Sequence, residues 1–220
     1  RIFRKLKKIA HYKKYRDIQR ERQYKLTNEL DLQKRLLSRI DYLSTVLPSE
    51  YDILSKYEYI KAIYFPFQYV SNHKLNTDDI EENASIILVG NSATATNNHF
   101  DVFNVLKNRA ILNKCIVPCS YGNDTYLSKL KDVLKNMQNV QVLDTFVPYE
   151  EYSKMLKACR VGVFGHLRQQ AMGNIVTCML HGSKVFLWRD SVAYQYFKSE
   201  GYIIYTIDDS CNSSIYNSFI

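Results

Sequence analysis

The sequence has no run of about 18 apolar residues, so no segment of it is predicted to span a bilayer. Charged residues open the chain without a following apolar stretch, so we do not expect these residues to be a secretory signal peptide. The five cysteines form no Cys-x-x-Cys pair, and their odd number favours reduced thiols in a cytoplasmic protein. No His, Cys, Asp and Glu residues have metal-ligand spacing, so we expect no protein-bound metal.

Several functional signatures are also missing. The chain contains neither Gly-x-Gly-x-x-Gly nor a P-loop, so dinucleotide and P-loop sites lack their characteristic residues. There is no Gly-x-Ser-x-Gly nucleophile elbow and no evident catalytic triad. Tyrosine is abundant, with 18 residues, but they are scattered and form no RNA-binding signature. The function therefore has to be inferred from less standard features.

What the sequence does contain is a basic N-terminal segment on an otherwise ordinary composition. Its 220 residues are 46% apolar and 24% charged, values typical of a globular chain of one or two domains. Residues 1–40 hold 14 Lys and Arg against 4 Asp and Glu, whereas the rest holds 16 against 18. The net charge of +8 thus belongs to one end of the chain, and the body is close to neutral.

From residue 84 onward, apolar runs of strand length alternate with amphipathic segments of helix length. Strands are predicted at 85–90, 115–119, 140–143, 161–164, 184–188 and 202–205, and helices near 100–106, 124–137, 149–157, 170–180 and 191–199. Continuous apolar runs are typical of parallel strands that are covered on both faces. The pattern predicts an α/β fold with a doubly wound, mostly parallel sheet of about six strands.

The first 80 residues have a different pattern. Ile2, Leu6 and Ile9 share one face of a basic helix. Farther on, a strand at 40–43, a helix opening at Pro48 and a strand at 61–65 resemble the end of another α/β unit. A polar stretch at 72–83 serves as a linker. We therefore expect two domains, 1–80 and 81–220, with most of the first lying upstream of Arg1.

The loops that follow the predicted strands are the candidate binding elements, since an open parallel sheet binds ligands at the carboxyl ends of its strands. The loop 90–99 holds small hydroxyl and amide residues that suit an oxyanion, or it is a polar turn with Asn98 as a helix N-cap. The loop 118–124 has the features of a turn. The loop 145–151 either starts a helix at Pro148 or, as a turn of the form aromatic–Val–Pro–aromatic, holds a flat base against backbone groups.

The loop 165–174 is the most informative. Arg168 offers two parallel donors, the following helix offers free backbone N–H groups, and Gly173 permits a close approach. Such a cradle suits a diphosphate and stabilises a leaving pyrophosphate without a metal, although Arg and Gln are also common on helix surfaces. We expect His99 and His166 to be hydrogen-bonding residues rather than catalysts.

Four segments in this order resemble a known family. They are Ile87-Leu-Val-Gly-Asn-Ser92, Ile116-Val-Pro118 with Tyr121-Gly122, Phe146-Val-Pro-Tyr-Glu-Glu-Tyr152 and Arg168-Gln-Gln-Ala-Met-Gly-Asn174. The family is glycosyltransferase family 56, the TDP-N-acetylfucosamine:lipid II N-acetylfucosaminyltransferases, also called 4-α-L-fucosyltransferases. The similarity covers about residues 40–205 and is strongest over 84–190.

The resemblance implies a GT-B fold, with a Rossmann-like donor domain at 81–220 preceded by the C-terminal part of a second Rossmann-like acceptor domain. It places Gly90, Asn91 and Ser92 along the donor diphosphate, Phe146, Val147 and Glu151 near the base and ribose, and Arg168, Gln169, Gln170 and Asn174 on the diphosphate and sugar. The family's acceptor-side base is expected upstream of Arg1, so no catalytic residue is assigned.

The resemblance also implies the reaction. N-acetylfucosamine or fucose passes from a nucleoside-diphosphate donor, dTDP- or GDP-linked, to a polyprenyl-linked saccharide, with no metal and no further cofactor. The pathway is a bacterial surface glycan of the enterobacterial common antigen kind. The enzyme is expected to be cytoplasmic and peripheral on the inner membrane, with residues 1–25 binding anionic lipid. A solvated helix face is the simpler explanation of those charges.

Two alternatives remain at this stage. Residues 1–40 could be the basic arm of a nucleic-acid-binding module, although the slightly acidic body and the missing motifs argue against a nucleic-acid partner. The chain could also be a non-catalytic remnant that only binds a nucleotide sugar.

Overall fold

A computed structural model describes residues 27–66, 86–108 and 113–208 of the chain. The chain divides into two compact units, Arg1–Tyr69 and Val70–Ile220, which are described separately. The predicted basic helix at the start of the chain and the predicted linker at 72–83 lie outside the described residues. The predicted domain boundary at residue 80 lies outside them too and stays a prediction.

The first unit contains the strand–helix–strand succession that the sequence predicts. Residues 27–37 are helical, and β1 (Tyr42–Leu43), α2 (Pro48–Leu54) and β2 (Ile63–Tyr64) follow. The two strands pair in parallel, with Tyr42 opposite Ile63. Pro48 takes the start of α2, where its fixed φ suits a helix, and the Glu50 carboxylate accepts a hydrogen bond from the Leu47 N–H at 2.9 Å.

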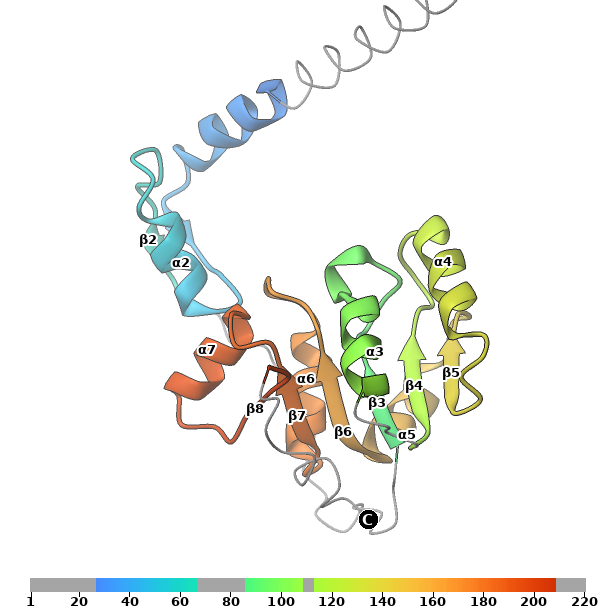
Figure 1. Ribbon diagram of the computed structural model, residues 1–220. Coiled ribbons are helices and arrows are strands. Elements are labelled where there is room, and N and C mark those ends of the chain that lie inside the picture. The colour runs from blue at the N-terminus through green and yellow to red at the C-terminus, as the bar shows by residue number, and fades with distance from the viewer. Residues whose placement is uncertain (1–26, 67–85, 109–112, 209–220) are drawn as a thin grey trace, which may run out of the picture. The chain divides into compact units, whose positions relative to one another are not determined.

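The second unit is a six-stranded parallel sheet with helical crossovers (Figure 1). Its elements are β3 (Ile86–Val89), η2 (Ala95–Asn97), α3 (His99–Asn108), β4 (Cys115–Pro118), α4 (Asp124–Leu134), β5 (Val140–Leu143), α5 (Tyr149–Lys157), β6 (Cys159–Phe164), α6 (Met172–Leu180), β7 (Lys184–Leu187), α7 (Val192–Ser199) and β8 (Tyr205–Thr206). The strand order is β5-β4-β3-β6-β7-β8. The predicted doubly wound α/β architecture is confirmed.

The predicted sixth strand was placed too early. Tyr202 to Ile204 are not in a strand; the Tyr202 ring packs edge-on against Phe197 of α7, with their centroids 5.4 Å apart. Ile204 is buried, while Ile203 points to solvent. The apolar run therefore covers the end of α7, and the sheet gains its last strand only at Tyr205, which pairs with Phe186.

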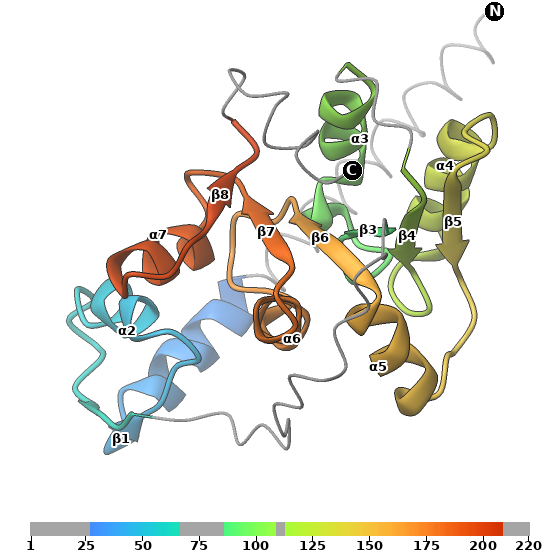
Figure 2. The same ribbon diagram turned by 90° about the horizontal axis from the view of Figure 1, so that it is seen from below.

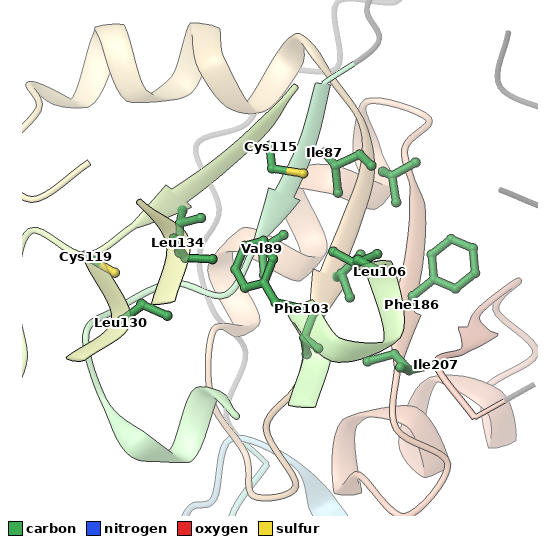
Figure 3. Close-up of a cluster of buried hydrophobic side chains, with 14 of the residues drawn as sticks. Ile87, Val89, Phe103, Leu106, Cys115, Cys119, Leu130, Leu134, Phe186 and Ile207 are labelled. Atoms are coloured by element: carbon green, nitrogen blue, oxygen red, sulfur yellow. The ribbon is translucent and has the colours of Figure 1, made fainter. Parts of the chain in front are cut away.

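Successive residues of the strands pack into two separate hydrophobic cores, one on each face of the sheet. Ile87 and Val89 pack with Phe103 and Leu106 of α3 on one face of the sheet (Figure 3). Leu88 faces the opposite core, which α5, α6 and α7 complete. Figure 2 shows α3 and α4 on one side of the strands and α5 and α6 on the other. Coverage of both faces explains why the sequences of the inner strands β3 and β4 are continuously apolar.

The strand order also locates a crevice. The chain runs outward from β3 through β4 to β5, then crosses to β6 and continues to β8. The order of the strands therefore reverses between β3 and β6. Loops leave such a point in opposite directions, so the carboxyl ends of β3 and β6 form the natural binding crevice of the sheet.

Candidate functional site

The loops that follow β3 and β6 are joined by the side chain of Gln170. Its Nε2 donates to Asn91 Oδ1 at 3.0 Å, and its Oε1 accepts from Thr96 Oγ1 at 2.8 Å. Arg168 Nε also donates to this oxygen at 3.3 Å. The structure thus brings Asn91, Arg168 and Gln170, three of the predicted site residues, to the switch point of the sheet.

The loop after β3 is organised from within by Asn97. This buried residue donates through Nδ2 to the Ser92 carbonyl at 2.9 Å and to Ser92 Oγ at 3.0 Å. Its Oδ1 accepts from the Asn91 N–H at 3.1 Å. Ser92 is itself buried, and its carbonyl and hydroxyl oxygens accept hydrogen bonds from Asn97, so the structure places it where it holds the loop in shape.

Gly90 has a structural requirement of its own. Its φ is +69°, and a Cβ at this position would lie 2.4 Å from Nε2 of His99. His99 is fully buried and pairs through Nδ1 with the Tyr126 hydroxyl at 3.1 Å, as the sequence predicts for a hydrogen-bonding residue. Burial lowers the pKa of His99 to about 4, so this ring stays neutral near pH 7.

One expectation for this edge of the sheet needs correction. Neither ring nitrogen of His166 has a hydrogen-bond partner in the described part of the chain, although hydrogen bonding was expected. Burial lowers the pKa of His166 to about 4. Asn98, offered as the N-cap in the alternative interpretation of this loop, directly precedes α3 and accepts through its carbonyl from the Val102 N–H at 3.0 Å, and its Nδ2 donates to the Gly165 carbonyl at 2.7 Å.

The N-terminus of α6 is open. Its N-cap residue is Ala171, with φ +58°, and the methyl side chain of this residue makes no capping hydrogen bond. This left-handed residue also explains why the helix begins at Met172 rather than at the predicted Gln170. The first amide N–H groups of a helix have no acceptor within the helix, and they carry the positive end of its dipole. Gly173 is exposed, and a Cβ there would meet no atom within 4 Å.

Beside this helix end is a pocket of about 270 Å³. It is lined by Asn91, Pro118, Ser120, Tyr121, Leu143, Thr145, Phe146, Val147, Tyr152 and Asn174. The loops after β3, β4 and β5 therefore contribute to one cavity, together with α5 and α6. Four predicted site residues line it: Asn91, Phe146, Val147 and Asn174.

The pocket combines exposed aromatic surface with fixed polar groups. Phe146 is 84% exposed and Tyr121 is 60% exposed. The Tyr121 hydroxyl accepts a hydrogen bond from Asn91 Nδ2 at 2.9 Å, and the Tyr152 hydroxyl accepts one from Asn174 Nδ2 at 2.8 Å. Burial raises the pKa of Tyr152 far above its ordinary range, so it stays protonated. Such a surface can stack on a planar ring.

Two predicted donor-binding residues belong neither to the pocket nor to the hydrogen bonds around Gln170. Glu151 is exposed on α5, and Gln169 is partly buried in the loop before α6; neither lines the pocket. Their assignment to the donor stays a prediction. The sequence-based list also missed Tyr121 and Tyr152, which line the pocket. Both tyrosines belong to the segments that carry the family resemblance, which was the available signal.

Among residues 27–66, 86–108 and 113–208, no three His, Cys, Asp or Glu side chains gather as metal ligands would. None of the helices in these ranges has both the length and the apolar character to cross a membrane.

Comparison with known proteins gave one family and several similar solved structures. The sequence model of the family described as 4-alpha-L-fucosyltransferase, glycosyl transferase group 56, matches residues 49–217. The pneumococcal O-GlcNAc transferase GtfA, solved in complex with UDP and GlcNAc, is 15% identical over 87% of this chain and 39% of that chain, with a TM-score of 0.59. The GtfA/B complex is 13% identical over the same shares, with a TM-score of 0.56.

These likenesses confirm the predicted GT-B type of fold. At such low sequence identity they show the fold alone. The chain spans about two fifths of the length of the two solved structures that it matches.

Proposed function

The chain belongs to glycosyltransferase family 56, and from this membership we propose that its second unit binds a nucleoside-diphosphate sugar as the donor of a glycosyl transfer. The observation that carries the proposal is the meeting of four loops around the open end of α6. Gln170 holds two of these loops together, and the pocket joins the others to them.

The diphosphate fits the N-terminus of α6. Backbone N–H groups and the helix dipole favour an anion at this position. Arg168 is exposed and uses its Nε on Gln170, so its two terminal nitrogens can reach phosphate oxygens. Open space at Gly173 lets a phosphate approach the backbone closely.

The base fits the pocket beside this helix. Its aromatic residues, Phe146 and Tyr121, offer surface for stacking, and its amides and hydroxyls offer specific hydrogen bonds. The similar pneumococcal enzyme was solved with UDP, which supports a nucleotide as the ligand of this fold. The proposed donor of the present chain is a dTDP- or GDP-linked sugar. Glu151 and Gln169 complete the proposed set of donor-binding residues.

In the reaction, the bond between the sugar and the diphosphate breaks and a new glycosidic bond to the acceptor forms. Arg168 and the α6 N-terminus stabilise the charge that develops on the leaving diphosphate, without a metal ion. The sugar is N-acetylfucosamine or fucose, and the acceptor is a polyprenyl-linked saccharide of a bacterial surface glycan. The protein would work at the cytoplasmic face of the inner membrane. Its acceptor-side base is unassigned.

Replacement of Arg168 by alanine tests the proposal. Hydrogen bonds to a charged group contribute about 1.5–3 kcal/mol, so we expect Arg168→Ala to weaken nucleoside-diphosphate binding at least tenfold in calorimetry. Arg160→Ala is the matched control, because Arg160 is at the amino end of β6, whereas Arg168 follows its carboxyl end. Unchanged donor affinity and turnover in Arg168→Ala would show that this loop is not the diphosphate site.

A further inference from the structure

A second pocket lies at the same edge of the second unit, beside α3. Its volume is about 460 Å³, within the range of small-molecule sites. It is lined by Asn98, Asp101, Asn104, Val105, Leu167 and Trp188. None of these residues lines the pocket assigned to the base.

The lining combines a flat apolar wall with hydrogen-bonding groups. Trp188 and Leu167 provide the apolar surface, and Leu167 is half exposed. Asp101 and Asn104 are exposed one turn apart on α3, and no hydrogen bond or ion pair to another described residue occupies their side chains. These groups are therefore available to a ligand.

The charge of the lining excludes some ligands. Among the described residues, the lining holds one carboxylate and no Lys, Arg or His, so it disfavours a phosphate or another anion. A single carboxylate is also too few for a divalent cation, which needs several oxygen ligands. A neutral molecule with an apolar face and several hydroxyl groups fits an indole face beside exposed carboxylate and amide groups, which is the chemistry of a saccharide ring.

The pocket is held in shape by backbone contacts. The Leu167 carbonyl accepts from the Val192 N–H at 3.0 Å, which ties the loop after β6 to the start of α7. Asn98 Nδ2 donates to the Gly165 carbonyl at 2.7 Å, which ties the start of α3 to the same loop. A site preformed in this way loses little entropy when it binds.

The position of the pocket relates it to the donor. Leu167 lines it, and the next residue in the chain, Arg168, turns toward Gln170 and the proposed diphosphate site. We propose that this second pocket is a saccharide subsite, in which the sugar packs on Trp188 and hydrogen bonds to Asp101 and Asn104. This assignment rests on the proposed function and adds the location of a sugar to it.

Trp188 makes the subsite directly observable, because it is the only tryptophan in the chain. We expect L-fucose, N-acetylglucosamine or its β1-4-linked disaccharide to shift Trp188 emission and to reduce its quenching by acrylamide. Asp101→Asn should weaken this response at least fivefold, since it replaces a charged acceptor by a neutral one. Asp124→Asn is the matched control, with the same change in the first turn of α4.

Two further titrations distinguish the source of the sugar and separate this proposal from the first. If the pocket holds the donor sugar, GDP-fucose binds more tightly than GDP, and Asp101→Asn removes the difference while GDP affinity stays unchanged. If it holds an acceptor sugar, only the response to free saccharides is lost. The subsite is refuted if no saccharide changes Trp188 emission and Asp101→Asn alters no affinity. Failure of GDP, UDP and dTDP to bind the unaltered chain refutes the donor site instead.

Discussion

His99 and His166 are completely buried, and burial lowers the pKa of each from an ordinary 6.5 to about 4. The folded protein therefore keeps both rings neutral where the unfolded chain protonates them. Between about pH 6.5 and 4 the unfolded state binds more protons, so the free energy of unfolding decreases as the pH falls. At 1.36 kcal/mol per pKa unit, the fall of each pKa from 6.5 to about 4 makes the loss at most about 3–4 kcal/mol for each histidine.

We predict that the midpoint of urea unfolding drops steadily between about pH 7 and 4.5. The Asp144 carboxylate, whose pKa is lowered by its hydrogen bond to Lys131, contributes only below its ordinary value of 3.8, which separates the two effects. His166→Asn should remove about half of the pH dependence. A midpoint that stays constant over this range would contradict the burial of the two rings.

At the scale of elements, the glycines at the two ends of α6 separate binding from folding. Gly173 lies in the first turn, and Gly182 lies beyond the last turn with φ +74°. A Cβ would meet nothing within 4 Å at either position. The same substitution is therefore sterically free at both ends but differs in its backbone cost and in its distance from the proposed diphosphate site.

We predict opposite outcomes for the two alanine variants. Gly173→Ala should stabilise the protein by about 0.5–1 kcal/mol, as alanine does in a helix, and weaken nucleoside-diphosphate binding at least tenfold. Gly182→Ala should destabilise it by about 1–2 kcal/mol, since its φ is left-handed, and leave binding unchanged. Thermal unfolding and calorimetry measure the two effects. Unchanged nucleoside-diphosphate affinity in Gly173→Ala would show that no phosphate approaches the backbone closely at this position.

The elements also show what the sequence can predict. β3 to β7 follow from apolar runs, because strands covered on both faces need no polar alternation. The apolar run at 202–205 was predicted as a strand, but most of it covers the end of α7, and an apolar run suits either place. The loops at the carboxyl ends were predictable from the fold class. The bridge between Thr96 and Gln170 was not, since it depends on β3 and β6 being neighbours in the sheet.

At the scale of the whole molecule, the excess of positive charge lies at the start of the chain. Residues 1–25 hold 11 Lys and Arg against 2 Asp and Glu, and they lie outside the described residues. A basic segment adds about 1 kcal/mol of attraction to anionic lipid for each charge near the surface. The same charges would attract nucleic acid with a strong salt dependence.

We predict that the chain sediments with vesicles of anionic phospholipid and that deletion of residues 1–25 abolishes this binding. The deletion should leave nucleoside-diphosphate affinity unchanged, because the proposed donor site lies entirely in the second unit. A gel-shift assay with DNA and RNA over a range of salt is the comparison. Tight nucleic-acid binding without vesicle binding would favour a nucleic-acid module over a membrane-associated transferase.

NMR of the amide groups during titration with GDP, UDP and dTDP shows whether the carboxyl edge of the β3–β8 sheet binds a nucleoside diphosphate. The predicted result is that at least one nucleotide shifts the amides of Gly173, Asn174 and Asn91 more than those of residues 27–66. Shifts confined to residues 27–66, or no shift with any nucleotide, would contradict it.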